Sequence, residues 1–363
     1  MHAGQRPGRE HKRILGIAAA IPLILAGCGS AAAPSSAPAS AAPATAAAEP
    51  SAAPPSVAPE ETLELAYISF AVANSYDAPM LAAARASATA GNANLTVFDG
   101  NLNPATQTQQ LQDAIASGKY DGIVLQPVYG PALVPGAEAA IAAGIAIGNI
   151  DQILGADNTT ADSQVEGQLV NVVFVPSELG RKIGELVVTA CADANPCNVG
   201  YIWSVKAAAL DATLKEAFDE ATSVNPNIKI VAEGESFYTT PLGLKAAQDM
   251  LAAHPDITVI TGADQAITGA VQAVADAGLK DSVKLVGYGG GAIAFQGIAS
   301  GERFGTVMQA PATEGGLGVQ MFIDAIRSGT PAPGIDVLAD LPDGGVVTKD
   351  NVDGFLTLAE WPG

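Results

Sequence analysis

Residues 121–150 read DGIVLQPVYGPALVPGAEAAIAAGIAIGNI. The run Asp121–Leu125, apolar after its first residues, is typical of a buried strand, and Ile145–Ile150 is a second run of this kind. Between them, Ala132–Ala143 consists mostly of helix formers, and Gly144 ends the predicted helix. Two strands separated by one helix in so short a stretch predict parallel strands joined by a right-handed crossover.

The same strand–helix unit recurs on both sides of this stretch. Before it, Asn103 and Pro104 are a typical helix cap and first-turn proline, and Gly118 ends that helix. After it, the polar segment 151–177 fits no helix well, and then the pattern restarts. Further strands are expected at Leu63–Ile68, Leu95–Phe98, Val199–Trp203, Ile228–Ala232, Ile257–Thr261, Val283–Gly287 and Thr306–Gln309, and Val346–Thr348 ends the regular part. Further helices are expected at Asp77–Ala90, Leu179–Thr189, Ala207–Thr222, Leu242–Ala253, Gln265–Ala277 and Glu314–Arg327.

Two successive series of this kind predict an α/β protein with two doubly wound, Rossmann-like parallel-sheet lobes that face each other. Ligands of open parallel sheets bind beyond the carboxyl ends of the strands, so the residues that follow the strands are candidates for a cleft. They are Ser69, Phe70, Asn74, Tyr76, Asp99, Gln126, Tyr129, Asp151 and Gln152 in the first series, and Trp203, Tyr238, Asp264, Tyr288 and Gln309 in the second.

These candidates combine aromatic rings with neutral or acidic hydrogen-bonding groups, and no Arg is among them. Aromatic faces contact C–H surfaces and Asp, Asn and Gln bond hydroxyl groups, so the set favours a neutral, hydroxylated ligand. Each residue also has a plainer interpretation. Phe70 and Tyr288 could belong to the core, and Asp and Asn in loops often bond their own backbone.

Composition narrows the function further. The chain has 363 residues, 48% of them hydrophobic and 15% charged, which is enough for two domains with buried cores. The 17 Lys and Arg against 37 Asp and Glu give a net charge of −20, which argues against nucleic acid as a partner. Of the 3 His residues, His2 and His11 lie in an N-terminal segment that we expect to be removed. The remaining one, His254, cannot form a His-rich zinc site, and any Ser-His-Asp triad would have to use it. We expect no catalytic residue, metal or cofactor.

The N-terminus is predicted to be a signal peptide. In residues 1–28, the basic residues Arg6, Arg9, Lys12 and Arg13 precede an uncharged run, 14–26, shorter than the roughly 20 residues that a membrane-spanning helix needs. The run ends in Leu25-Ala26-Gly27-Cys28, which resembles the lipobox of bacterial lipoproteins. By that resemblance, Cys28 carries lipid and anchors the mature protein to the membrane. The alternative is an ordinary secretory signal with a chance Cys.

Residues 29–60 are almost wholly Ala, Pro, Ser and Thr, with seven prolines and Val57 as the one large hydrophobic residue. Such a segment cannot bury enough surface to offset its ordering entropy, so we predict a disordered, extended tether between membrane and domain. Farther along, Cys191 and Cys197 enclose a turn-rich loop. Outside the cytoplasm such cysteines are more often bridged than free, which predicts a disulfide.

Five passages of the domain share their order and spacing with one known family. They are Asn103-Pro104 with the Gln-rich helix to Ile115, the sequence DGIVLQP at 121–127, AHPDI at 253–257, LVGY at 285–288 and VVTKDN at 346–351. In these the chain resembles the periplasmic sugar-binding proteins of the ribose- and galactose-binding type, from about residue 63 to 351. The resemblance implies the type I periplasmic binding protein fold, in which two lobes joined by a three-stranded hinge close on a sugar.

The resemblance also implies roles for individual residues. Asn74 and Tyr76 match the polar and aromatic contacts after the first strand, and Asp151 matches the acidic residue that takes two sugar hydroxyls. Tyr238 matches a stacking aromatic of the second lobe, and Gln309 a hinge-side amide. The full predicted ligand site is Asn74, Tyr76, Gln126, Asp151, Gln152, Trp203, Tyr238, Asp264 and Gln309.

Several positions depart from the family pattern. Gln152 stands where the family has an Arg, and no Arg occurs at 211–214, where another usually reaches into the cleft. Ala263 replaces an Asn, and Gly289 replaces the Asp expected after Tyr288. These losses remove charge-assisted hydrogen bonds to a simple pentose, so the ligand is expected to be another sugar, a polyol or something less hydroxylated.

The family implies the domain division as well. An N-terminal lobe is expected at 61–174 plus 310–340 and a C-terminal lobe at 175–309 plus 341–363. The connections between lobes are expected near Val175, Gln309 and Leu341.

The resulting hypothesis is an extracytoplasmic, lipid-anchored and monomeric solute-binding protein that delivers a neutral sugar or polyol to the permease of an ABC importer. A ligand sensor that signals to a membrane receptor would use the same fold. A glycosidase using Asp151 and Asp264 from opposite lobes is the third alternative, and it requires the two carboxyls to lie about 5–9 Å apart.

Overall fold

The computed structural model describes residues 61–363, and all elements below come from this part of the chain. The predicted signal peptide, the lipid-bearing Cys28 and the tether at 29–60 lie outside the described residues. Within 61–363, no helix has both the length and the apolar character needed to cross a membrane.

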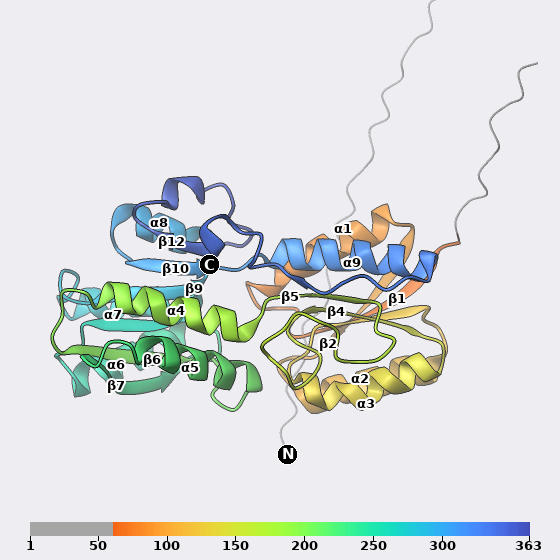
Figure 1. The fold of residues 1–363 in the computed structure, drawn as a ribbon, viewed down its shortest axis with the longest axis horizontal. Helices are drawn as coiled ribbons and strands as arrows, with labels where there is room; N and C mark the ends of the chain where they lie inside the picture. Colours follow the sequence, from red (N-terminus) through yellow and green to blue (C-terminus); the bar gives the residue numbers. More distant parts are fainter. Residues whose placement is uncertain (1–60) are drawn as a thin grey trace, which may run out of the picture. The chain divides into compact units, whose positions relative to one another are not determined.

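The first sheet has six parallel strands in the order β11-β5-β4-β3-β1-β2. They are β1 (Leu63–Ser69), β2 (Ala93–Asp99), β3 (Gly122–Leu125), β4 (Ala146–Asp151), β5 (Val170–Val173) and β11 (Ile335–Asp336). The helices of this lobe are α1 (Asp77–Ala90), α2 (Pro104–Ser117), α3 (Gly130–Ala142) and α9 (Pro311–Ser328). Helices α1 and α9 cover one face of the sheet and α2 and α3 the other (Figure 1).

The second sheet also has six strands, in the order β12-β10-β9-β8-β6-β7. They are β6 (Cys197–Trp203), β7 (Ile228–Glu235), β8 (Val259–Ala263), β9 (Lys284–Gly289), β10 (Gly305–Met308) and β12 (Val346–Thr348), and β12 runs antiparallel to β10. One face carries α4 (Pro176–Ala190) and α5 (Ala209–Thr222), and the other carries α6 (Thr240–Ala253) and α7 (Asp264–Asp276). Helix α8 (Ala292–Ser300) packs against β10, and two short 3₁₀ turns lie at Pro342–Gly345 and Val352–Gly354.

Local signals place these elements where the sequence predicts them. The Asn103 side chain accepts hydrogen bonds from the backbone N–H groups of Ala105 and Thr106, at 2.9 and 3.0 Å, and so caps α2. Gly118 ends the same helix in the left-handed conformation, with φ of 60°. The α/β class, the two doubly wound lobes and every predicted strand and helix are therefore present.

Three elements were not predicted: β5 and β11 in the first sheet and α8 in the second lobe. Strand β5 lies inside the polar segment 151–177, and its four residues are all buried. Its Asn171 looks unsuited to a core, but its amide donates to Ala161 O at 2.6 Å and accepts from Asn149 at 2.8 Å. Such long-range partners satisfy a buried amide and cannot be seen in a single sequence.

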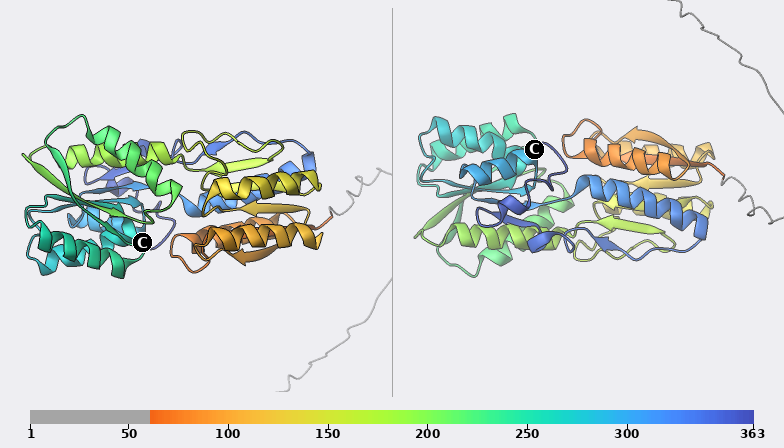
Figure 2. Two further views of the ribbon diagram at one scale, coloured as in Figure 1. Left: turned by 90° about the horizontal axis from the view of Figure 1, so that it is seen from below. Right: turned by 90° about the horizontal axis from the view of Figure 1, so that it is seen from above.

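The chain passes between the two sheets three times, from β5 to α4, from β10 to α9 and from β11 to β12. Figure 2 shows these segments running between the two groups of elements. The first passage includes Val175, and the second includes Gln309.

The predicted disulfide is confirmed: Cys191 and Cys197 are bonded, at an S–S distance of 2.05 Å. It joins the end of α4 to the start of β6, and both cysteines are buried. The bridge lies away from the carboxyl ends of the strands and carries no chemistry for a ligand site.

Candidate functional site

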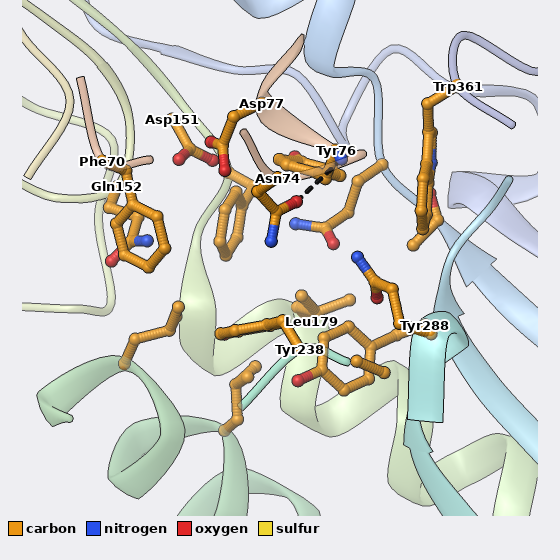
Figure 3. A pocket seen from close by; sticks show the side chains of 17 residues that line it. Phe70, Asn74, Tyr76, Asp77, Asp151, Gln152, Leu179, Tyr238, Tyr288 and Trp361 are labelled. Carbon is orange, nitrogen blue, oxygen red and sulfur yellow. Dashed lines mark hydrogen bonds between the residues drawn. The ribbon is translucent and has the colours of Figure 1, made fainter. Parts of the chain in front are cut away.

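A cavity lies where the carboxyl ends of strands from both sheets meet, and the empty space in and around it, part of which is open to solvent, is about 480 Å³. Its wall is formed by Phe70, Asn74, Tyr76, Asp77, Asp151, Gln152, Phe174, Leu179, Leu210, Leu214, Tyr238, Ala263, Gln265, Tyr288, Gly289, Gln309 and Trp361. Figure 3 shows Asn74, Tyr76, Asp77 and Asp151 on one side and Leu179, Tyr238 and Tyr288 opposite them. The strand-end rule thus identifies the region in which a ligand can be held.

Six of the nine predicted ligand residues line this cavity. They are Asn74, Tyr76, Asp151, Gln152, Tyr238 and Gln309. Asn74 also has the plainer role considered from sequence, because its Oδ1 accepts the backbone N–H of Tyr76 at 2.8 Å. Its amide nitrogen keeps two N–H donors for other partners. Phe70 and Tyr288, for which a core role was an alternative, line the cavity as well.

Gln126 does not line the cavity but lies directly behind two residues that do. Its Oε1 accepts from Tyr67 OH and Phe70 N, both at 3.1 Å, which turns its amide nitrogen toward the carboxyls of Asp77 and Asp151. That nitrogen donates to Asp77 Oδ1 and, at 3.0 Å, to Asp151 Oδ2. Gln126 is fully buried, and its hydrogen bonds position the two acids.

Trp203 is likewise absent from the cavity wall. As the last residue of β6 it directs its side chain to the face covered by α5 rather than beyond the strand end, and its ring lies 5.2 Å from that of Tyr201. The indole N–H donates to Glu233 Oε2 at 3.1 Å. The expectation that Trp203 contacts ligand is therefore not supported, because side chains alternate between the two faces of a strand.

Asp264 is the third predicted residue outside the cavity wall. It is completely buried, accepts the Gly290 N–H at 2.7 Å and pairs with Arg303 at 3.3 Å. Thr306 also donates to it at 3.0 Å. Asp264 therefore ties α7 to the loop after β9 and to β10. The glycosidase alternative needs the carboxyls of Asp151 and Asp264 at the same cavity, but Asp151 lines the cavity and Asp264 does not.

Trp361 was missed from sequence, since no strand precedes it. Its ring packs edge-on against Tyr76, with centroids 5.6 Å apart, and its indole N–H donates to Gly289 O at 2.9 Å. A Cβ at Gly289 would lie 2.6 Å from the Trp361 ring, and Gly289 has a φ of 130° that only glycine adopts readily. The indole thus occupies the space beside the position where the family pattern has an Asp, which explains that departure.

Two acidic groups, Asp77 and Glu314, lie next to Asp151 at one side of the cavity. Asp77, Asp151 and Glu314 are at most 3% exposed, and they come from α1, the end of β4 and the first turn of α9. Burial raises the pKa of Asp77 well above its usual range, and the neighbouring Asp151 raises it further. Burial raises the pKa of Asp151 to about 6, although the hydrogen bond from Gln126 opposes the shift. Burial and the charge of Asp151 raise the pKa of Glu314 well above its usual range.

Two of the site residues have unusual backbone conformations. Asp151 has a φ of 69° and Tyr238 a φ of 53°, in the left-handed region that costs non-glycine residues of order 1–3 kcal/mol. Both residues line the cavity. Such strain is common at ligand-binding sites, but Leu102 and Phe237, which do not line this cavity, share the conformation.

The opposite wall is held by a second hydrogen-bonded group. Tyr288 OH and Ser204 Oγ share a hydrogen bond of 2.7 Å, and Asp211 accepts the Ser204 N–H at 2.9 Å. Burial raises the pKa of Asp211 to about 7. Within residues 61–363, no group of three or more His, Cys, Asp or Glu side chains is arranged to hold a metal ion.

Comparison with known protein families matches residues 65–330 to a periplasmic binding protein domain. The chain belongs to the periplasmic binding protein family. This periplasmic binding protein is 30% identical over 235 residues to the D-allose-binding periplasmic protein of Escherichia coli strain K12, covering 62% of this chain and 71% of the relative. It is 27% identical over 244 residues to a D-ribose/D-allose-binding protein of Pseudomonas aeruginosa, covering 66% of this chain and 73% of the relative.

Among solved structures, an ABC transporter solute binding protein from Mycobacterium smegmatis with bound glycerol is similar over 84% of this chain and 100% of its own. The TM-score is 0.69 at 25% sequence identity. These findings confirm the resemblance to periplasmic sugar-binding proteins and the type I fold that it implied.

Proposed function

We propose that this periplasmic binding protein captures a sugar or polyol in its cavity and delivers it to the membrane permease of an ABC importer. The observation that carries the proposal is the cavity wall, which combines six aromatic residues with amides and carboxyls and contains no Lys or Arg. Aromatic faces accept the C–H surfaces of a sugar ring, and the polar groups bond its hydroxyls. The names of the two curated relatives agree with this ligand class.

The cavity composition also disfavours other ligand classes. A phosphate or carboxylate ligand needs cationic partners, and the wall supplies none. A large apolar ligand would leave Asp151, Gln152 and Gln309 without hydrogen-bond partners, which is costly for buried groups. A hydroxylated small molecule satisfies both the rings and the polar side chains.

Delivery requires that the permease distinguish loaded from free protein. We propose that the lobes 61–174 plus 310–340 and 175–309 plus 341–363 close about the three passages near Val175, Gln309 and Leu341. The cavity draws residues from both lobes, with Asp151 on one side and Tyr238 on the other, so ligand contacts favour the closed form. An unchanged radius of gyration on saturation with a bound ligand would contradict this closure.

We further propose that the protein works outside the cytoplasm as a monomer, held to the membrane by lipid on Cys28 and spaced from it by residues 29–60. The Leu25-Ala26-Gly27-Cys28 sequence supports the anchor, and membership of the periplasmic binding protein family supports the location. A substrate-binding subunit held near its permease meets it at high effective concentration.

The binding site is tested by isothermal titration calorimetry with a panel of sugars and polyols, starting from whatever co-purifying molecule native mass spectrometry detects. For a ligand found in this way, Tyr238→Ala and Asp151→Ala should each cost more than about 1 kcal/mol of binding, since one loses a ring face and the other a hydrogen-bonding carboxyl.

Tyr120→Ala is the matched control for Tyr238→Ala. Tyr120 precedes β3 at the opposite end of the sheet and contacts Phe98, so its removal should leave affinity unchanged. Unchanged affinity in both cavity variants would mean that the ligand binds elsewhere, and no thermal stabilisation by any compound of the panel would contradict the proposed function.

A further inference from the structure

The acidic side of the cavity has no matching positive charge. Asp77, Asp151 and Glu314 bring three carboxyls together, and Asp77 and Asp151 line the cavity. None of the ion pairs among residues 61–363 includes any of the three, and no Lys or Arg lines the wall. A buried carboxyl without a cationic partner either keeps its proton or is ionised at a cost of several kcal/mol, so a cation bound in the cavity would favour the ionised form of Asp151.

Unsatisfied hydrogen-bonding atoms mark the place of such a cation. Among the described residues, Asp151 Oδ1, both carboxyl oxygens of Glu314 and the neighbouring Tyr76 OH are buried and have no hydrogen-bond partner. Asp151 is 2% exposed and lines the cavity, and Figure 3 shows its carboxyl beside that of Asp77. Glu314 faces Asp151, with which it can share a proton but not a second negative charge. Tyr76 OH can serve as one donor to Asp151, and the carboxyl keeps lone pairs for a further donor from the cavity. A charged donor would also balance the negative charge that Asp151 and Glu314 share.

The aromatic part of the wall favours the same kind of group. Tyr76 adjoins the acids and packs edge-on against Trp361, with an interplanar angle of 79°. Phe70 and Tyr238 form a second edge-on pair, with centroids 6.3 Å apart and an angle of 82°. The electron-rich faces of such rings attract cations, most strongly where water is excluded. Rings and carboxyls together form the usual surroundings of a protonated amine in a protein.

We propose that the ligand is a hydroxylated molecule that carries a protonated amine, such as an amino sugar or an aminated cyclitol. This inference rests on the proposed function and specifies its ligand class. The ammonium group donates to Asp151 Oδ1 and lies beside Asp77 and the ring of Tyr76. The side chains of Asn74, Gln152 and Gln309, elsewhere on the same wall, bond the hydroxyls. A fully neutral sugar can also donate a hydroxyl to Asp151, but it leaves the negative charge of the ionised Asp151 without a counter-charge.

The test compares matched ligands that differ at one group. Calorimetry on the purified full chain is run with D-glucose, D-glucosamine and N-acetyl-D-glucosamine, with the corresponding galactose series, and with myo-inositol and its amino-deoxy analogue. At pH 7 we expect at least one amine to bind ten times more tightly than its hydroxyl counterpart, which corresponds to about 1.4 kcal/mol. Its N-acetyl derivative, which keeps the nitrogen and loses the charge, should lose this preference.

Variants test whether the acids create the preference. Asp151→Asn should reduce the amine-to-hydroxyl affinity ratio at least tenfold, and Asn tolerates the left-handed backbone at this position. Glu314→Gln, which keeps the shape of a buried side chain, should change the ratio less than Asp151→Asn, because the raised pKa of Glu314 already favours its neutral form. Asp256→Asn is the control, because Asp256 precedes β8 at the end of the strand away from the cavity. Thermal melts identify variants that fail to fold.

The possible outcomes separate the two proposals. If neutral sugars bind as well as or better than every amine, or if Asp151→Asn leaves the ratio unchanged, the amine inference is overturned and the proposed sugar-binding function stands. If no compound of either kind binds, the proposed function itself is overturned.

Discussion

Asp211 is a carboxyl whose ionisation the fold opposes. It is 1% exposed, accepts the Ser204 N–H at 2.9 Å and lies 3.5 Å from Tyr238 OH. Burial is the main reason that its pKa rises to about 7, and the nearby charge of Glu235 adds to the shift. In an unfolded chain the same carboxyl has an ordinary pKa near 4, so the folded protein holds a proton that the unfolded chain has already released.

This difference sets the sign of a pH effect on stability. Between about pH 4 and pH 7 the folded state binds more protons at Asp211 than the unfolded state, so its contribution to stability falls as pH rises. Asp211→Asn removes the titration and keeps an oxygen for the Ser204 N–H. The free energy of unfolding of the variant minus that of the parent should therefore increase by on the order of 2 kcal/mol from pH 5 to pH 8.

Urea unfolding of both proteins at the two pH values measures the effect. The ionisable side chains that act on Asp211 are Tyr238 and Glu235, and it acts in turn on Tyr201 and Tyr288. All four remain in the variant, and Asp77 and Glu314 also titrate equally in both proteins. A stability difference between the two proteins that is the same at pH 5 and pH 8 would contradict the assignment.

For single residues, the sequence predicts well which ones lie near the cavity. It predicts less well which of these side chains line the cavity. Asp151 and Asp264 both follow buried strands, yet the first lines the cavity and the second pairs with Arg303, 39 residues farther along the chain. The partner, and therefore the role of the carboxyl, is decided by tertiary contacts. Trp361 gave no signal, because it follows an irregular C-terminal segment rather than a strand.

Among the elements, α9 connects the passage from β10 to the acidic side of the cavity. Its first turn carries Glu314, and the next residue, Gly315, contacts α1 so closely that an added Cβ would lie 2.2 Å from Met80 O. A backbone oxygen cannot move aside as a side chain can. Glycine at 315 therefore lets two helices approach at the place where Glu314 meets Asp151.

Gly315→Ala should destabilise the protein by more than about 2 kcal/mol, because the two helices must separate to admit the methyl group. Gly316→Ala on the same helix is the matched control. Its Cβ would have 3.5 Å to the nearest atom, and alanine favours a helix over glycine by up to about 1 kcal/mol, so it should be neutral or stabilising. Thermal denaturation of both variants measures the change in stability. Equal changes in the two variants would contradict the close approach of α1 and α9.

Elements with strong local signals were predicted nearly to the residue, as the cap at Asn103 and the stop at Gly118 show. Elements without such signals were missed. Helix α8 has nine residues and follows three glycines, 289–291, which read as a loop. Strand β5 has four residues, and one of them is a polar Asn whose partners lie elsewhere in the fold. Short elements held by tertiary contacts carry little local information.

For the whole molecule, alternating strands and helices were enough to predict two lobes, because parallel sheets require such alternation. The alternation of strands and helices says nothing about whether or how the protein is attached to the membrane. The proposed anchor gives a prediction at this scale. In a bacterium that processes lipoproteins, the parent chain should partition with membranes, and Cys28→Ser should be found in the soluble extracytoplasmic fraction, since its lipid is lost.

The double variant Cys191→Ser, Cys197→Ser is the control for this experiment. It removes the disulfide between α4 and β6 but keeps the lipid-bearing residue, so it should stay with the membranes. Equal membrane association of Cys28→Ser and the parent would show that another feature holds the protein there.

The placement of Trp361 has a practical consequence. The chain contains 2 tryptophans, and only Trp361 lines the cavity, whereas Trp203 packs against its own lobe. Ultraviolet emission from the indole of Trp361 therefore provides a label-free signal of occupancy, and the emission of Trp203 supplies a steady background. Exchanging each tryptophan for phenylalanine in turn separates the two contributions, so ligand binding can be followed by intrinsic fluorescence without an added label.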